Sequence, residues 1–183
     1  MIKLFTDRLI IRELNINDLE NHYELMSNNN VMYYLQDIKK DSIEESEEDL
    51  NKIINDANST NRKYYFFVIE NKITNEFIGE IGYTVLYNTP CGKQVDLGYF
   101  INEEYWNKGY TTEALKRVIE FAFEEDNVYR IKTGCIKENF GSEKVMQKNG
   151  FIKEGEFKEC VFHDGKLKNR VQYRLLKNEW KKI

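Results

Sequence analysis

Residues 105–115, with the sequence YWNKGYTTEAL, place a lysine, a glycine and two threonines directly before an amphipathic run. Such a run predicts a helix, whose N-terminus exposes unpaired N–H groups at the positive end of the helix dipole. Gly109 would let the backbone approach a bulky anion, and Lys108 adds a positive charge. These residues therefore have the chemistry of a phosphate site. The spacing alone also fits a simpler interpretation, in which Gly109 forms a turn and Thr111 or Thr112 is the N-cap of the helix.

Composition limits the classes of protein to which this chain can belong. It has 183 residues, of which 41% are hydrophobic, and this is enough for one folded domain over residues 1–183. The net charge of −4 comes from interspersed charges of both signs, which argues against a nucleic-acid or membrane-surface partner. No apolar run is long enough to span a membrane, and the N-terminus carries charge too early for a signal peptide. We therefore expect a soluble cytoplasmic domain.

The residue types that commonly bind metals are few and scattered. Cys91, Cys135 and Cys160 are widely spaced and odd in number, and the histidines His22 and His163 stand alone. This pattern predicts neither a disulfide framework nor a zinc site, and we expect no metal.

The strands that must position these residues can be predicted from runs rich in β-branched and aromatic residues. These runs lie at 9–11, 64–70, 76–87, 94–101, 129–136, 151–162 and 166–176. Asp164 and Gly165 join the last two, since an Asp-Gly pair is a strong hairpin signal.

Four helices are predicted from capping patterns and apolar periodicity. The sequence NDLE at 17–20 has the form of a capping box before the first helix, and the spacing of Ser42 and Glu45 repeats it before the second. A third helix is expected over 112–125 and a short fourth one over 142–149. In the third helix, four charged residues are expected to face water: Glu113, Arg117, Glu120 and Glu124.

The predicted order of elements is βααβββαβαββ. This order indicates the α/β class, with a mixed and mainly antiparallel sheet. The helix over 112–125 connects two strands by a crossover, which predicts a parallel pair at that point.

Three segments, in the same order along the chain, resemble the GNAT superfamily of acetyl-CoA-dependent N-acetyltransferases. They are VDLGYFI, YWNKGYTTEAL and ENFGSEKVMQKNGFIKEGEF. Within the superfamily the chain is most similar to the RimJ/RimL type, which acetylates protein N-termini and other amines. The resemblance covers nearly the whole chain, from TDRLIIREL to NRVQYRLL. It implies the GNAT fold, acetyl-CoA as co-substrate and direct transfer of an acetyl group to a primary amine.

The resemblance also implies where the coenzyme binds. The family's phosphate loop, [Q/R]-x-x-G-x-[G/A], falls on residues 106–111, and its central glycine matches Gly109. Residues 107–112, here named the clamp, are expected to hold the pyrophosphate through the backbone N–H groups of Asn107, Lys108, Gly109, Tyr110, Thr111 and Thr112. In the preceding strand, Phe100 and Ile101 are expected to offer backbone groups to the pantetheine arm, whose amides pair like those of a peptide.

The segment ENFGSEKVMQKNGF resembles the family's N-x-x-S-x-x-[VA]-x-x-K-x-G-F pattern. This match implies that Asn139 bonds the pantetheine arm and that Ser142 lies near the thioester sulfur. Without the family, Ser142 would be interpreted as the N-cap of the short helix, and the two roles are compatible. Many relatives carry a tyrosine acid where this chain has Met146, which moves the acid's role to Ser142 or a water.

Two carboxylates are candidates for the base that this reaction requires. An amine nucleophile must lose a proton, and a carboxylate can accept it directly or through water. Asp96 occupies the position where RimJ/RimL-type sequences usually have Glu before Gly-Tyr, and Glu80 on the preceding strand is the second candidate. Strand carboxylates are also often paired or solvated, so a purely structural role stays open for both.

The acidic run 44–49, EESEED, has two interpretations. It could attract a polycationic acceptor, or it could be the solvated face of a capped helix. At the level of function, a non-catalytic CoA-binding or regulatory domain is the alternative to an enzyme. The acceptor amine, whether a peptide N-terminus, a polyamine or an antibiotic, is not defined by the sequence, and neither is the assembly state, monomer or homodimer.

Overall fold

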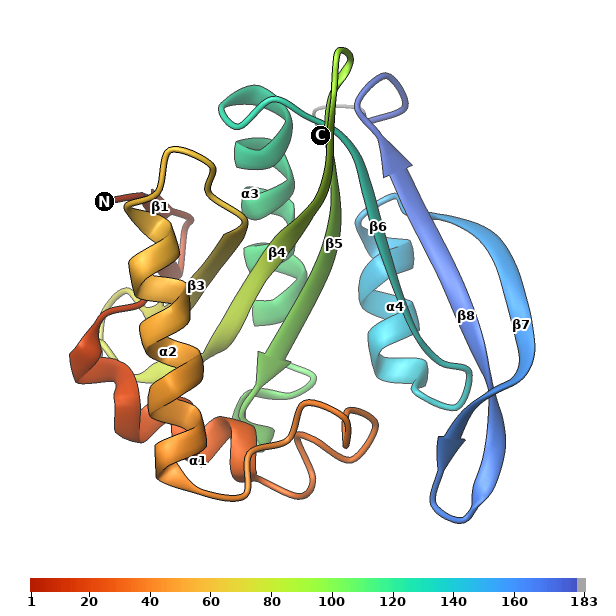
Figure 1. Cartoon of the computed structure of the whole chain (residues 1–183), viewed down its shortest axis with the longest axis horizontal. Coiled ribbons are helices and arrows are strands. Elements are labelled where there is room, and N and C mark those ends of the chain that lie inside the picture. The colour runs from red at the N-terminus through yellow and green to blue at the C-terminus, as the bar shows by residue number, and fades with distance from the viewer. Residues whose placement is uncertain (181–183) are drawn as a thin grey trace.

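One eight-stranded sheet runs through the whole protein (Figure 1). The structure is a computed structural model that describes residues 1–180. The strand order across the sheet is β1-β2-β3-β4-β5-β6-β8-β7, and β5–β6 is a parallel pair among antiparallel neighbours. The strands are β1 (Lys3–Phe5), β2 (Leu9–Glu13), β3 (Tyr64–Asn71), β4 (Phe77–Thr89), β5 (Gly92–Ile101), β6 (Val128–Ile136), β7 (Ile152–His163) and β8 (Lys166–Leu176). The predicted fold class and the predicted parallel pair are confirmed.

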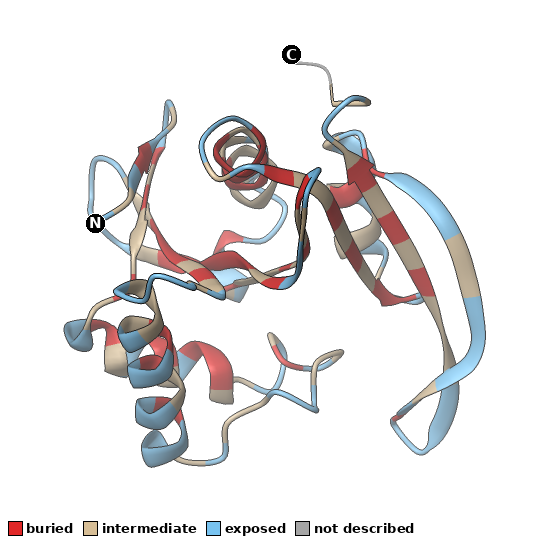
Figure 2. Ribbon diagram, turned by 45° about the horizontal axis from the view of Figure 1, so that its top comes forward, coloured by how far each residue is buried: buried red, intermediate tan, exposed pale blue. Residues whose placement is uncertain are grey.

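Helices cover both faces of this sheet (Figure 2). The helices α1 (Leu19–Ser27) and α2 (Ile43–Ala57) lie on one face, while α3 (Tyr110–Glu124) and α4 (Phe140–Lys148) lie on the other. The strand period of two explains this layering: on β3, Phe67 packs into the core under α3, and its neighbour Val68 packs with Leu50 of α2. No helix within residues 1–180 is both long and apolar enough to cross a membrane.

The N-terminal region differs from the sequence prediction in two details. β1 was not predicted, because three residues give too little pattern to identify a strand. The capping box also lies two residues earlier than expected. Asn15 accepts from the N–H of Asn17, and the Asp18 carboxylate accepts from the N–H of Asn15, which opens a short 3-10 helix (Ile16–Asp18) before α1. The prediction of a box at 17–20 was therefore wrong in register.

Helix α3 begins earlier than predicted, and the charged residue of its first turn is engaged with the chain before β2. It starts at Tyr110, so Thr111 and Thr112 lie inside the first turn and neither is the N-cap. Glu113 does not simply face water: its carboxylate accepts from the Thr6 hydroxyl at 2.6 Å and from the Arg8 guanidinium at 2.6 Å. The helix is therefore tied at its first turn to the chain that leads into β2.

Strands β5 and β6 separate along their length, which is the feature of the fold that matters most for the site (Figure 1). They pair from Lys93↔Val128 to Asp96↔Lys132. Beyond that point residues 133–136 of β6 pair with β8, and residues 97–101 of β5 pair with β4. The space between these two segments is here named the β5–β6 gap. Among the strands of residues 1–180, none pairs with these two segments across the gap, so its edges carry backbone groups open to a ligand.

The chain between α1 and α2 crosses the wide end of this gap (Figure 1). Asn30 donates to both carboxylate oxygens of Glu103, which follows β5, at 3.0 and 2.9 Å. A few residues later the Tyr34 hydroxyl donates to the backbone carbonyl of Glu138, which follows β6, at 3.3 Å. This segment therefore connects the two diverging halves of the sheet on the face where α1 and α2 lie.

Candidate active site

The clamp has the backbone geometry of an anion site. Asn107 and Gly109 both have positive φ, 60° and 81°, and Gly109 is the N-cap of α3 with no side-chain cap. Within residues 1–180, no hydrogen bond engages the backbone N–H groups of Tyr110, Thr111 or Thr112. Three free donors at the positive end of a 15-residue helix can hold a phosphate group.

Arg8 supports the clamp and was not identified from the sequence. Its guanidinium donates to the carbonyl of Lys108 at 3.1 Å and lies 4.4 Å from the centre of the Tyr110 ring. Arg8 also pairs with Glu113. Burial raises the pKa of the Glu113 carboxyl, but the hydrogen bonds from Thr6 and Arg8 lower this pKa by more, so it lies below its ordinary value. The contact spans about a hundred positions in the chain, so no local pattern could reveal it.

Along β5, the backbone N–H and carbonyl groups of successive residues point alternately towards β4 and towards the β5–β6 gap. The N–H of Asn102 donates to the carbonyl of Ile78 at 3.0 Å. Because alternate residues of an antiparallel strand bond to the same neighbour, Phe100 bonds to β4, and Ile101 turns its backbone groups towards the gap. Of the two residues predicted to offer backbone groups, the alternation favours Ile101.

The side chains around this edge have distinct partners. The indole N–H of Trp106 donates to the Ile101 carbonyl at 2.7 Å, so the Ile101 N–H is the group left for a ligand. The Phe100 side chain lies on the opposite face, where it lines a cavity described below. The Phe100 side chain therefore belongs to the wall of this cavity and not to the open edge of β5.

Three polar side chains meet where the gap closes against α4. The Tyr99 hydroxyl lies 2.8 Å from the Ser142 hydroxyl and donates to the Ser142 carbonyl at 3.1 Å. The Cys135 thiol points to the carbonyl of Asn139 at 3.7 Å. Burial raises the pKa of Tyr99 well above its ordinary value, by more than the Ser142 bond lowers it. Tyr99 is therefore a protonated donor, whereas its sequence pattern indicates only a core side chain.

The N-cap of α4 is Asn139 and not Ser142. The Asn139 side-chain oxygen accepts from the N–H of Ser142 at 3.1 Å. The capping role considered for Ser142 was therefore wrong, and its hydroxyl is engaged with Tyr99 instead. The Asn139 amide nitrogen stays available for the predicted bond to a ligand.

The cap predicts a measurable loss of stability. We expect Asn139→Ala to lower the free energy of unfolding by about 1 kcal/mol, because it removes the acceptor for an orphan N–H. Asn139→Asp should keep most of the stability, since a carboxylate accepts the same bond and is favoured near a helix N-terminus. Urea unfolding of both variants measures this. Equal losses in both would contradict the capping role.

A cavity of about 260 Å³ lies between the sheet and the helices α1 and α2. Its apolar lining includes Met26, Ile53 and Phe100, and its charged lining includes Glu80 and Asp49. Since Phe100 belongs to the strand that borders the gap, the cavity and the gap lie on two sides of β5. We name it the acceptor cavity.

Glu80 is buried in the wall of the acceptor cavity. Its carboxylate lies 2.8 Å from Nδ1 of His22 on α1, and both side chains are 2% exposed. The sequence pattern singles out Glu80, but it gives no reason to join it to His22, 58 positions away. Their contact depends on how α1 packs on β4.

Asp96 lies elsewhere. Its carboxylate is 41% exposed and pairs with Lys132 on β6 at 3.2 Å, at the point where β5 and β6 part. Within the described chain it is not among the residues that line the acceptor cavity. The structure therefore brings Glu80, but not Asp96, to this cavity.

The acidic run 44–49 forms the start of α2. All four glutamates of this run are exposed, whereas Asp49 at its end lines the acceptor cavity. Asp49 pairs with Lys40 at 3.6 Å. Most of the run is thus a solvated helix face, as one of the two interpretations expects.

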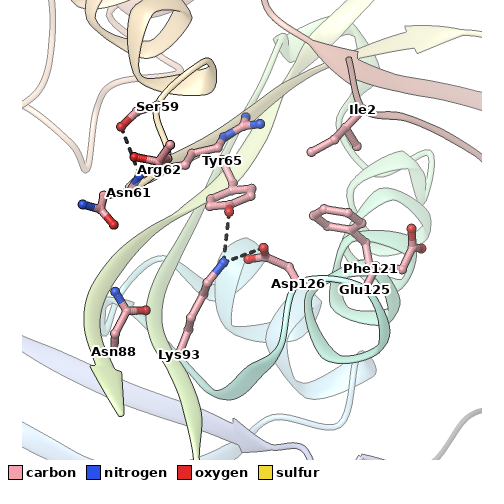
Figure 3. Close-up of a pocket in the computed structure, with 11 residues that line it drawn as sticks. Ile2, Ser59, Asn61, Arg62, Tyr65, Asn88, Lys93, Phe121, Glu125 and Asp126 are labelled. Atoms are coloured by element: carbon pink, nitrogen blue, oxygen red, sulfur yellow. Dashed lines mark hydrogen bonds and ion pairs between the residues drawn. The ribbon is translucent and has the colours of Figure 1, made fainter. Parts of the chain in front are cut away.

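A second cavity, of about 600 Å³, lies at the other end of β4 and β5 (Figure 3). Its main cation, Lys93, bonds to Asp126 at 2.6 Å and to the Tyr65 hydroxyl at 3.0 Å, and Arg62 lies over the Tyr65 ring. These charges are paired within the protein. The cavity is remote from the clamp, so it is not part of the candidate site.

Known proteins agree with this architecture. The family model described as "Acetyltransferase (GNAT) domain" matches residues 8–152, and the chain belongs to this family. The uncharacterized N-acetyltransferase YnaD of Bacillus subtilis (strain 168) is 31% identical over 175 residues, which cover 96% of this chain and 97% of that protein. The family predicted from the sequence is confirmed, and the protein is an N-acetyltransferase.

Two solved structures share the fold closely. A ribosomal-protein-S5-alanine acetyltransferase from Vibrio fischeri has a TM-score of 0.85 at 21% identity, with all of both chains covered. A spermidine N-acetyltransferase from Vibrio cholerae, in complex with CoA and spermine, has a TM-score of 0.84 at 23% identity and covers 95% of this chain and 98% of its own. At these identities the likeness establishes the fold alone.

Proposed function

We propose that this protein transfers an acetyl group from acetyl-CoA directly to a primary amine at the end of an extended acceptor. One observation supports the proposal: two different candidate sites border the same strand, β5. The clamp and the β5–β6 gap lie along its open edge, and the acceptor cavity lies on its α1/α2 face, with Phe100 in its wall. Two reactants held on either side of one strand would be brought together in a fixed orientation.

The residues present fit the coenzyme. The free N–H groups of Tyr110, Thr111 and Thr112 would hold the pyrophosphate, as helix N-termini do for phosphates in general. The N–H of Ile101 would pair with the pantetheine arm, which can add to a strand edge like a peptide, and the amide nitrogen of Asn139, at the start of α4, would donate to the same arm. The coenzyme would supply the activated acetyl group as a thioester near Tyr99 and Ser142.

Direct transfer is favoured over an acetyl-cysteine intermediate. Cys135 is the cysteine nearest the Tyr99–Ser142 pair, and only a thiolate would be an effective nucleophile. Burial raises the pKa of Cys135 to about 11, and the Ser142 bond lowers it by less. The thiol therefore stays protonated at neutral pH and does not compete with the amine.

The acceptor cavity has an excess of acidic side chains, because Asp37, Asp49 and Glu80 line it together with Lys40 and Lys52, and this favours a cationic group at the end of a chain. At about 260 Å³ it is large enough for an amine-bearing terminus but too small for a whole peptide. Asp37 also lines it, and a carboxylate in this wall could pair with a second positive group. The two proteins of similar fold act, by their names, on a ribosomal protein and on spermidine. A peptide N-terminus and a polyamine are accordingly the two acceptor classes to test.

Of the two carboxylates considered as bases, Glu80 has the better position. It lies in the wall of the acceptor cavity, whereas the carboxylate of Asp96 is paired with Lys132. The base is therefore proposed on the Glu80 side of β5.

A thiol-release assay tests the function. The protein is incubated with acetyl-CoA and, in turn, a peptide that begins with alanine, a peptide that begins with serine, and spermidine. We expect acceptor-dependent release of free thiol and, when both substrate concentrations are varied, intersecting double-reciprocal plots of a ternary complex. Parallel plots would instead indicate a covalent intermediate. Binding of acetyl-CoA in calorimetry without thiol release for any acceptor would support a non-catalytic CoA-binding domain.

A further inference from the structure

A histidine and a glutamate are buried together in the wall of the acceptor cavity. His22 and Glu80 are each 2% exposed, and they bond at 2.8 Å between Nδ1 and Oε1. Most of this face of the sheet is apolar, with Leu50, Ile53 and Val68 in its core. Burying two ionisable groups there is unfavourable unless each is paired, and an apolar pair of similar volume would serve the packing as well. The pair therefore suggests a chemical role.

The second ring nitrogen of His22 has no hydrogen-bond partner in the described part of the chain. Within residues 1–180, Nε2 is buried and makes no hydrogen bond, and Asp49 is the acid nearest to it in the structure, with Oδ2 at 3.9 Å. A buried nitrogen without a partner is unfavourable in the free protein. Because His22, Glu80 and Asp49 all line the acceptor cavity, a ligand there can supply the missing partner.

The tautomer of His22 follows from its bond to Glu80. An ionised carboxylate is an acceptor only, so Nδ1 must carry the hydrogen that it donates to Glu80. In the neutral ring Nε2 then presents a lone pair. A carboxylate that fixes an imidazole in this way produces a general base at the other nitrogen.

We infer that His22 is the general base of the acetyl transfer, accepting the proton of the acceptor ammonium at Nε2 while Glu80 holds the ring and stabilises the imidazolium. This inference rests on the proposed function. It changes the role of Glu80 from the group that takes the proton to the group that positions the one that does.

The acceptor ammonium gives one proton to Nε2 of His22, and the freed lone pair attacks the carbonyl carbon of the thioester. The new C–N bond forms, the C–S bond breaks, and the sulfur leaves with the bonding electron pair. The nitrogen loses its second proton, which neutralises the sulfur as a thiol, and His22 later releases its own proton to solvent. The products are the acetylated amine, free CoA and one proton.

The charges that face His22 come from three elements. Glu80 lies on β4, Asp49 on α2, and Lys40 on the segment before α2. Burial is the largest single influence and lowers the pKa of His22, but the bond and charge of Glu80 and the charge of Asp49 outweigh it, while Lys40 opposes them. The pKa of His22 is therefore raised. A base must be neutral, so activity should rise as pH increases through this raised value.

The test combines two variants with two measurements. We expect His22→Gln to lower kcat/KM about 10²-fold near neutral pH and to remove the ascending limb of its pH profile, with acetyl-CoA affinity unchanged. In Glu80→Gln, the new amide oxygen can still accept the hydrogen bond from Nδ1 of His22 but carries no charge. The pKa of His22 should therefore fall, and the ascending limb of the pH profile should move to lower pH. The acceptor is the alanine-initiated peptide or spermidine, whichever the wild type acetylates.

The titration of His22 can be followed without turnover. The chain has two histidines, so the NMR signals of the imidazole carbon-bound protons can be assigned with one variant, His163→Gln. His163 is a matched control because it is also buried, with Nε2 unpartnered within residues 1–180, but it lies at the end of β7. The His163→Gln variant should therefore keep the ascending limb of the pH profile. In the wild type and in Glu80→Gln, the NMR midpoint of His22 should coincide with the limb.

Three outcomes separate the possibilities. An His22→Gln variant that keeps the limb and loses less than about threefold in kcat/KM would overturn the role of His22. If that variant does not fold, a limb in Glu80→Gln that fails to move with the NMR midpoint would overturn it equally. A wild type that releases no thiol with any acceptor contradicts the proposed function itself, which is a different result from either of these.

Discussion

Gly109→Val is expected to weaken acetyl-CoA binding by about tenfold or more while the domain stays folded. Gly109 has a φ of 81°, which a β-branched residue avoids. A Cβ atom at this position would lie 3.5 Å from its nearest neighbour, the Arg8 guanidinium, so the strain comes from the backbone and not from a clash at Cβ. Relief of that strain would turn the N–H groups of the clamp away from a common point. Isothermal calorimetry with acetyl-CoA measures the loss.

The chain offers a control for backbone strain alone. Gly150 has a φ of 79° at the end of α4, and a side chain built there meets no atom within 4 Å. Gly150→Val should therefore lose similar stability but keep its affinity. Unchanged affinity in a folded Gly109→Val protein, or an equal loss of affinity in both variants, would contradict the assignment of the clamp.

The clamp could be predicted because its chemistry is local. A glycine that needs positive φ, a helix start and the free N–H groups of its first turn occupy consecutive positions, so their sequence pattern carries most of the information. The same holds for the parallel pair β5–β6, which follows from the crossover helix in the pattern of elements. The ends of the helices and strands were predicted less accurately. Helix α3, for example, begins at Tyr110, two residues before its predicted start.

The remainder of the site depends on contacts between distant segments. The partners in Arg8–Glu113, His22–Glu80 and Tyr99–Ser142 lie 105, 58 and 43 positions apart. Each partner is by itself an ordinary residue: a cation before a strand, a histidine on a helix, a tyrosine in a strand. The packing of α3 against β2, of α1 on β4 and of α4 beside β5 brings these three pairs together. One sequence alone does not specify the distances between these elements. The choice between Asp96 and Glu80 could not be made for the same reason.

The candidate site has two halves that carry different ionisable groups. On the α1/α2 face, His22 with Glu80 would remove a proton from the acceptor. On the α3/α4 face, Tyr99 with Ser142 offers a hydroxyl where the sulfur is proposed to leave. Strand β5 separates the two halves, so that one proton leaves on one face and a donor is present on the other.

Tyr99→Phe is expected to lower kcat about 10²-fold with little change in acetyl-CoA affinity. The sulfur leaves as a thiolate, and the Tyr99 hydroxyl can donate a bond to it or hold Ser142 so that Ser142 does. Because burial raises the pKa of Tyr99, this hydroxyl keeps its proton at every pH at which the enzyme would work. The substitution retains the ring in the core and removes only the donor. Steady-state thiol release and calorimetry on the same preparation measure both quantities.

The matched control is Tyr83→Phe, which removes a hydroxyl from a fully buried tyrosine of the same sheet. That hydroxyl bonds to Asp126 at 2.8 Å, near the cavity remote from the clamp, so its loss should lower stability and leave kcat unchanged. If Tyr99 and Ser142 act as a unit, Ser142→Ala and the double variant should each lose about as much as Tyr99→Phe alone, because the second removal deletes nothing further. Additive losses would mean that the two hydroxyls act separately. A Tyr99→Phe enzyme as active as Tyr83→Phe would mean that the leaving sulfur needs no hydrogen bond from this hydroxyl pair.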